Sequence, residues 1–182
     1  MNSKKKILAI SGSTRQSSAN LSLIKAIIDF SADNLEIKIF QGLPNIPHFN
    51  PDLDNDHAPD AVIDFRREIN EADGILVCTP EYAMGVPGTL KNAIDWTVSS
   101  CEFSHKPVAL ITASSQGQKG HLSLLETLKI IECDIPDDSQ LLISFIKTKV
   151  SSEGKITDAE TLRQVKKLMA SLTKTIKNKT VA

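Results

Sequence analysis

The chain has 182 residues, of which 41% are hydrophobic and 24% charged, a composition and length that predict one folded domain spanning residues 1–182. Its formal net charge is -1, which gives no overall basic character for binding nucleic acid or an anionic membrane. No stretch approaches the ~20 apolar residues that span a bilayer, and three cysteines without zinc-type spacing indicate reduced thiols in the cytoplasm.

The first part of the chain alternates strand and helix patterns. The apolar residues 7–10 are typical of a strand buried on both faces, and residues 35–40 alternate apolar and charged side chains, which favours a strand nearer a sheet edge. Between them, apolar residues recur at helical spacing from Asn20 onward. The residues 42–59 are rich in Pro, Asn and Asp and predict a long surface loop.

The rest of the chain continues this alternation. The fully apolar residues 74–78 predict a central strand. The other predicted elements are a helix over 61–72, a helix over 88–99, a strand over 107–112, a helix over 122–131, a strand over 141–145 and a helix over 158–177. Strands that alternate with helices imply a parallel sheet covered on both faces, so the predicted fold class is a doubly wound α/β domain.

Ligands of such folds bind beyond the carboxyl ends of the strands. Three polar loops follow the strands at 7–10, 74–78 and 107–112. The first loop, residues 11–20, carries four serines and a threonine before a helix N-terminus, where free backbone N–H groups and a partial positive charge favour a phosphate. Arg15 can add a bidentate, charge-assisted contact.

Two common phosphate-binding motifs are excluded from this first loop. It has no Lys-Ser/Thr at its end, so it is not a Walker A loop, and its single glycine excludes the dinucleotide-binding GxGxxG pattern. An alternative stays open, in which the segment is a plain loop with Asn20 as the helix N-cap and Arg15 exposed to solvent.

The two other loops have features of a binding site for a flat ligand. Residues 79–88 contain two prolines that stiffen the backbone and glycines that allow its close approach to a ligand. Tyr82 and Met84 more often serve packing, but their place in this loop predicts cofactor contacts. Residues 114–120 offer hydroxyls and amides to the edge of a heterocycle, although such compositions are common in turns. For Trp96 we expect a structural role rather than an interface.

Two long motifs occupy these loops. The first is Gly-Ser-x-Arg-x-x-Ser-x-Asn at residues 12–20, and the second is Pro-Glu-Tyr-x-x-x-x-Pro-Gly-x-Leu-Lys-Asn-Ala-Ile-Asp-Trp at residues 80–96. Together they resemble the NAD(P)H-dependent FMN reductase family, which includes bacterial quinone, chromate and azo-dye reductases. The resemblance runs from about residue 7 to residue 120. It implies a flavodoxin-like, five-stranded parallel sheet with strand order 2-1-3-4-5 and helices on both faces.

The sequence departs from the family pattern at three places. Ala83 stands where the family commonly has Asn, and Gly85 stands where it commonly has Ser. Residues 120–123 read Gly-His-Leu-Ser, whereas the family often has Gly-Gly-Ala-Arg. The first two changes remove side chains near the flavin, and the third bears on nicotinamide and acceptor preference more than on FMN binding.

The resemblance implies FMN as the cofactor and NADPH or NADH as its reductant. It places the FMN phosphate on the first loop, the ribityl chain and isoalloxazine ring along the second, and a further flavin contact on the third. With Met84 added from its loop position, the predicted cofactor-binding residues are Ser13, Arg15, Ser18, Ala19, Asn20, Pro80, Glu81, Tyr82, Ala83, Met84, Ser115 and Gly117. No catalytic side chain is predicted, because hydride transfer from nicotinamide to flavin needs no protein acid or base.

The expected function is hydride transfer from nicotinamide to FMN, followed by two-electron transfer to a small acceptor such as a quinone, azo compound, metal oxyanion or free flavin. The family also suggests a homodimer or homotetramer with the flavin near a subunit interface. Residues 42–59 and the helix that ends at Trp96 are the candidates to meet a partner chain.

Two other classes of function compete with this expectation. The first is an FMN-binding electron carrier or redox-responsive binding protein with little turnover. Flavodoxin-type carriers tend to be strongly acidic, and a net charge of -1 argues against this class. The second is a metal-dependent protein, since Asp52, Asp54 and Asp56 alternate. His57 and Ile63 stand where an EF-hand needs Gly and an acid, so no metal site is predicted.

Overall fold

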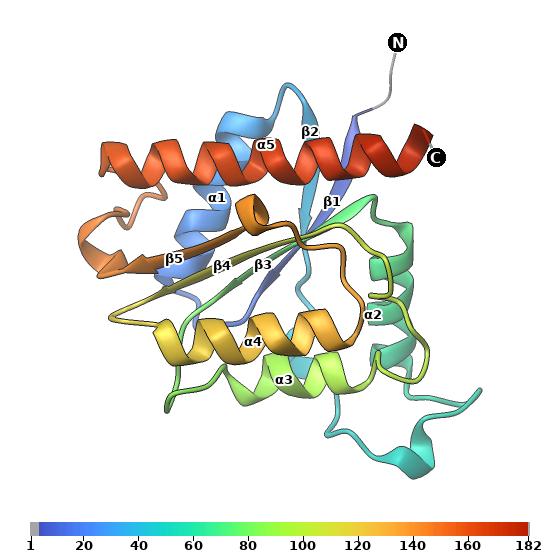
Figure 1. The fold of residues 1–182 in the computed structure, drawn as a ribbon. Helices are drawn as coiled ribbons and strands as arrows, with labels where there is room; N and C mark the ends of the chain where they lie inside the picture. Colours follow the sequence, from blue (N-terminus) through green and yellow to red (C-terminus); the bar gives the residue numbers. More distant parts are fainter. Residues whose placement is uncertain (1–3, 182) are drawn as a thin grey trace.

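The computed structural model describes residues 4–181, with side chains described for residues 4–179. Its five strands are parallel and lie in the order β2-β1-β3-β4-β5, as Figure 1 shows. The strands are β1 (Lys5–Ser11), β2 (Leu35–Ile39), β3 (Gly74–Thr79), β4 (Val108–Ser114) and β5 (Gln140–Ser144). The predicted fold class and strand order are confirmed, and β3 is central while β2 lies at an edge.

Helices cover both faces of this sheet. They are α1 (Ala19–Ser31), α2 (Asp60–Glu71), α3 (Gly88–Asp95), α4 (Gln118–Ile130) and α5 (Ala159–Val181). Helices α1 and α5 lie on one face, and α2, α3 and α4 lie on the other (Figure 1). Within residues 4–181, no helix is long and apolar enough to cross a membrane.

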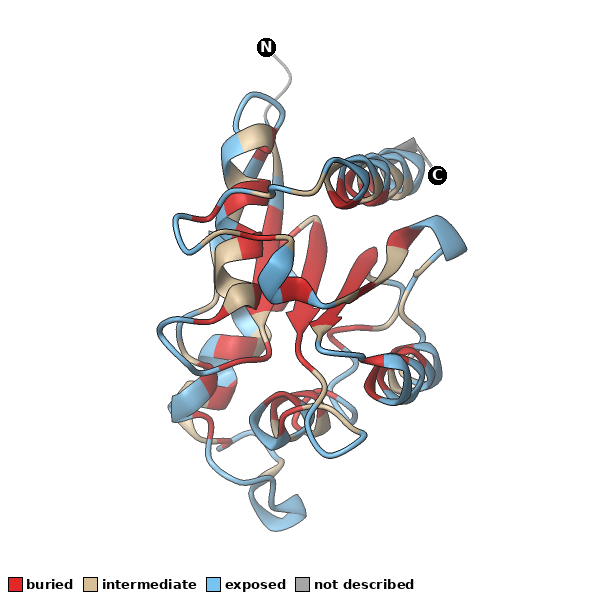
Figure 2. Cartoon of the chain, turned by 90° about the vertical axis from the view of Figure 1, so that its left-hand side faces the viewer, coloured by how far each residue is buried: buried red, intermediate tan, exposed pale blue. Residues whose placement is uncertain are grey.

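Strand β1 shows why the inner strands are continuously apolar. Ile7 and Ala9 pack in the cluster that includes α1 and α5, whereas Leu8 and Ile10 pack in the cluster that includes α2, α3 and α4. Because successive side chains of a strand point to opposite faces, a strand covered on both sides needs apolar residues at every position. Figure 2 shows these buried strands between the two layers of helices.

Three helix boundaries differ from the sequence prediction by four residues. One is the end of α5, which lies at Val181 rather than at residue 177. Helix α3 ends at Asp95 rather than near residue 99, and turns follow it. Helix α4 begins at Gln118, four residues before the predicted start, because Gly117 takes a left-handed conformation (φ 101°) as its N-cap. The third predicted loop therefore shrinks to 115–117. Trp96 is fully buried and its Nε1 donates to the carbonyl oxygen of Pro47 at 2.9 Å, which confirms its structural role.

The long segment 42–59 is held to the body of the protein by a partly buried arginine. Arg66 of α2 donates from Nη2 to Asp54 at 2.6 Å and from Nε to the carbonyl oxygen of Trp96 at 2.9 Å. Its Nε also lies 3.8 Å from Glu102. Asp54 accepts a second hydrogen bond from Ser99 at 2.6 Å, and this bond together with Arg66 lowers the pKa of the Asp54 carboxyl. One cation therefore joins α2, the long segment and the end of α3.

We predict that Arg66→Met lowers the free energy of unfolding by about 3 kcal/mol, because two mostly buried carboxylates lose their cation. Arg67→Met is the matched control, since Arg67 pairs with Asp64 at 2.7 Å on the exposed side of the same helix and should cost less than about 1 kcal/mol. Urea unfolding of both variants measures the difference. Equal losses would contradict this role of Arg66.

Candidate functional site

A cavity of about 720 Å³ opens where β1, β3, β4 and β5 end. Its walls come from the first loop, the start of the loop after β3, the end of β4 and the segment after β5. This is the carboxyl edge of the sheet, where ligands of doubly wound folds bind. The volume lies within the range of about 300–1,000 Å³ that is usual for small-molecule sites.

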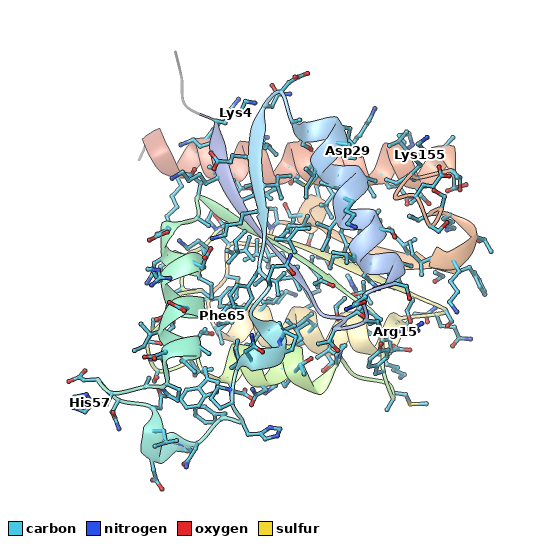
Figure 3. All side chains as sticks on the ribbon, turned by 180° about the vertical axis from the view of Figure 1, so that it is seen from behind. Lys4, Arg15, Asp29, His57, Phe65 and Lys155 are labelled. Atoms are coloured by element: carbon cyan, nitrogen blue, oxygen red, sulfur yellow. The ribbon has the colours of Figure 1, made fainter. Side chains whose placement is uncertain are left out.

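The first loop is ordered by its own hydroxyl groups. Ser18 is the N-cap of α1 and accepts a hydrogen bond from the backbone N–H of Asn20 at 3.2 Å. Ser13 accepts one from the backbone N–H of Arg15 at 3.4 Å. The N-cap is therefore Ser18 and not Asn20, whereas Arg15 is exposed to solvent, as the alternative interpretation expected. Figure 3 shows Arg15 at the end of the sheet where α1 begins.

Three hydrogen bonds fix this loop against the centre of the sheet. The buried Asn20 donates from Nδ2 to the carbonyl oxygen of Ala113 at 3.0 Å and accepts from Sγ of Cys78 at 3.3 Å. Gly12 donates from its backbone N–H to the carbonyl oxygen of Cys78 at 2.9 Å. A Cβ at Gly12 would lie 2.2 Å from Oγ1 of Thr79, so only glycine allows this approach.

The loop after β3 ends in a tight turn with unusual backbone angles. Tyr82 and Gly85 exchange two backbone hydrogen bonds of 3.0 and 2.9 Å, and the two residues between them have positive φ angles, 49° for Ala83 and 61° for Met84. Turns of this kind favour Asn and Gly, because other residues meet a steric cost there. Met84 is 75% exposed and Tyr82 is 47% exposed, so the turn presents apolar atoms to solvent.

A carboxylate links this loop to α4. Glu81 accepts a hydrogen bond from the backbone N–H of Gly120 at 2.6 Å. A Cβ at Gly120 would lie 2.6 Å from the carbonyl oxygen of Gly85, so the two segments touch through backbone atoms. The next residue, His121, is buried and its Nδ1 lies 2.9 Å from Oγ1 of Thr112. Burial lowers the pKa of His121 below its usual value, which favours the neutral ring.

All but three of the predicted cofactor-binding residues line the cavity. Those that line it are Ser13, Arg15, Ser18, Ala19, Asn20, Pro80, Glu81, Tyr82 and Ser115. Ala83, Met84 and Gly117 lie outside the lining, the first two in the projecting turn and the third at the N-cap of α4.

Sequence reasoning missed one wall of the cavity. The residues after β5 that line it are Phe145, Ile146, Lys147, Thr148, Val150, Ser151 and Ser152. The predicted strand at 141–145 could have indicated this wall. Ligands bind beyond the carboxyl ends of parallel strands, and this rule applies to the segment after 141–145 as it does to the loops after the three other strands. Ser17 and Ser22 also line the cavity and were not predicted.

The lining has the chemistry that FMN requires. Serine and threonine hydroxyls dominate the part formed by the first loop and the segment after β5, where Arg15 and Lys147 supply positive charge. Hydroxyls, cations and a helix N-terminus suit a polyol chain that ends in a phosphate. Pro80 and Tyr82 add apolar surface at the loop after β3. The residues present therefore fit FMN.

Comparisons with known proteins agree with this chemistry. Residues 5–148 match the family described as NADPH-dependent FMN reductase. An NAD(P)H-dependent FMN reductase of Pseudomonas aeruginosa is 31% identical over 173 residues, which cover 92% of each chain. A quinone reductase of Escherichia coli is 28% identical over 89% of this chain and 90% of its own length.

A solved structure extends the likeness to the fold. FerB, a flavoenzyme NAD(P)H:(acceptor) oxidoreductase from Paracoccus denitrificans, superposes with a TM-score of 0.78 at 25% identity. The match covers 96% of this chain and 98% of FerB.

We predict that Gly120→Ala lowers the free energy of unfolding by about 2 kcal/mol and weakens FMN binding, because the added methyl group pushes α4 away from Gly85. Gly88→Ala is the control, since a Cβ there meets no atom within 4 Å and alanine favours the helix that begins at this residue. Thermal unfolding and FMN titration of both variants test this. A Gly120→Ala protein as stable as Gly88→Ala would refute the close contact.

We also predict that Ala83→Asn stabilises the protein by about 0.5–1 kcal/mol, because asparagine tolerates the left-handed backbone better than alanine. The control is Ala32→Asn at the end of α1, where φ is -55° and no such relief is available. Urea unfolding compares the two. No gain at residue 83 would show that its backbone is unstrained.

Proposed function

The chain belongs to the NADPH-dependent FMN reductase family, and we propose that it passes electrons from NADPH or NADH through FMN to a quinone or related small acceptor. The single observation that carries this proposal is the cavity at the carboxyl edge of the sheet, because residues of both family motifs meet in its lining. Azo compounds, metal oxyanions and free flavin are the other acceptors that the proposal allows.

We assign the phosphate end of FMN to the first loop. Ser13 and Ser18 supply hydroxyls beside the N-terminus of α1, and Arg15 supplies a positive charge. A helix N-terminus favours a bound anion, because its backbone N–H groups carry partial positive charge. These groups would orient the cofactor by its phosphate and ribityl chain.

We assign the isoalloxazine ring to the loop after β3 and to Ser115. Pro80 is stiff and Glu81 is bonded to α4, so this wall is positioned before any ligand arrives. When bound, FMN supplies the redox chemistry, accepting a hydride from nicotinamide and giving two electrons to the acceptor. The protein binds and orients the reactants, and we assign no side chain as a proton donor.

We further propose that the protein is cytoplasmic and works as a homodimer or homotetramer, with residues 1–182 as one FMN-binding domain. Exposed apolar side chains support the expected contact regions. Phe49 and Leu53 on the long segment are 37% and 46% exposed, and Val98 after α3 is 53% exposed. Apolar groups of this kind are enriched where subunits meet. Light scattering during size-exclusion chromatography tests this, and a strict monomer at micromolar concentration would refute it.

The reductase activity is tested by the visible spectrum of the purified protein with FMN, before and after NADPH or NADH is added under nitrogen. We expect flavin to co-elute with the protein and its absorption bands at ~450 nm to be perturbed. These bands should bleach rapidly when the reduced nicotinamide is added. Free FMN with the same reductant is the control. Bound flavin that stays oxidised would favour the electron carrier or redox-responsive protein instead, and a protein that binds no flavin would overturn both.

A further inference from the structure

The segment after β5 forms a fixed wall of the cavity. The backbone N–H of Phe145 donates to the carbonyl oxygen of Ser115 at 3.1 Å, and the hydroxyl of Ser144 donates to the carbonyl oxygen of Gln116 at 2.9 Å. These bonds join the end of β5 to the loop after β4. The side chains that follow Phe145 are therefore held beside the third predicted loop.

Buried side chains and a turn hold the rest of this segment. Ile146 and Val150 are 5% and 7% exposed, and the backbone N–H of Val150 donates to the carbonyl oxygen of Ile146 at 3.1 Å. Gly154 has a φ of 78°, and a Cβ there would contact the carbonyl oxygen of Ser22 in the first turn of α1. The segment thus runs from the third loop to the start of α1.

Lys147 lies in the middle of this wall and lines the cavity with Arg15. Within the described part of the chain, neither side chain makes an ion pair or a hydrogen bond. The one acidic group in the lining, Glu81, is already bonded to Gly120. Two solvent-exposed cations from different segments therefore line one hydroxyl-rich cavity without a protein anion paired to either in the described residues.

A phosphate monoester carries about -1.5 to -2 charges at neutral pH. One arginine cannot neutralise it alone, whereas two cations can. We propose that Lys147 binds the FMN phosphate together with Arg15, and that the segment after β5 thereby selects FMN over the unphosphorylated flavin, riboflavin. This role of Lys147 rests on the proposed function, because it requires FMN in this cavity.

The test compares flavin affinities of the full chain, stripped of bound flavin, by quenching of flavin fluorescence. We expect Lys147→Met to weaken FMN binding about 10-fold, as the loss of one charge-assisted contact should, and to leave riboflavin binding unchanged. Lys147→Arg should restore FMN affinity to within about 3-fold. Added KCl should weaken FMN binding to the unaltered chain more than to Lys147→Met.

Lys149→Met is the matched control. Lys149 is two residues further along the same segment, but it does not line the cavity, so its loss should change FMN affinity by less than about 2-fold. Circular dichroism with thermal unfolding establishes that each variant is folded as the unaltered chain is.

Four results would overturn this role of Lys147. The first is unchanged FMN affinity in Lys147→Met. The second is an equal loss of affinity for FMN and for riboflavin, which would mean that Lys147 shapes the cavity wall and does not bind the phosphate. The third is a KM increase for NADPH but not NADH with FMN affinity intact, which would assign Lys147 to the nicotinamide cofactor. The fourth is an unaltered chain that binds no FMN, which alone also refutes the proposed function.

Discussion

The arrangement of the cavity depends on the hydrogen bonds of the buried Asn20 side chain. Its amide bonds to β4 through the carbonyl oxygen of Ala113 and to β3 through the thiol of Cys78. Burial raises the pKa of Cys78, so the thiol keeps the proton that it donates. The start of α1 and its serine-rich loop are thus fixed to β3 and β4, two of the three strands whose ends lead into the other walls of the cavity. A phosphate held there stands at a set position relative to those walls.

The fold was largely predictable because it depends on buried apolar strands. A strand covered on both faces needs the unbroken apolar runs found at residues 7–10 and 74–78, and alternation with helices leaves few topologies. Features set by single backbone angles were not predictable. Ala83 and Met84 carry no turn signal comparable to Asn-Gly, yet both adopt left-handed angles. Likewise, the polar residues at the start of α4 resemble a loop until the left-handed Gly117 is known.

The candidate site, like the fold, was predictable from sequence only in part. The motif residues of the first two loops were identified from sequence, because they follow the family pattern and the rule for parallel sheets. The wall from Phe145 to Ser152 was missed, since it has irregular backbone and lies beyond the resemblance that ended near residue 120. Its place beside α1 depends on long-range contacts of Ile146, Val150 and Gly154, which local sequence does not reveal. This wall also adds Lys147 to the positive charge that Arg15 brings to the cavity lining.

The most direct test of this account is a crystal structure of the full chain grown with FMN. We expect the phosphate on residues 13–20 beside the N-terminus of α1, and the ring between the loop after β3 and the loop after β4. Flavin bound elsewhere, for example in the lysine-lined groove between α1 and α5, would contradict it. So would crystals grown at saturating FMN that hold no flavin at the carboxyl edge of the sheet.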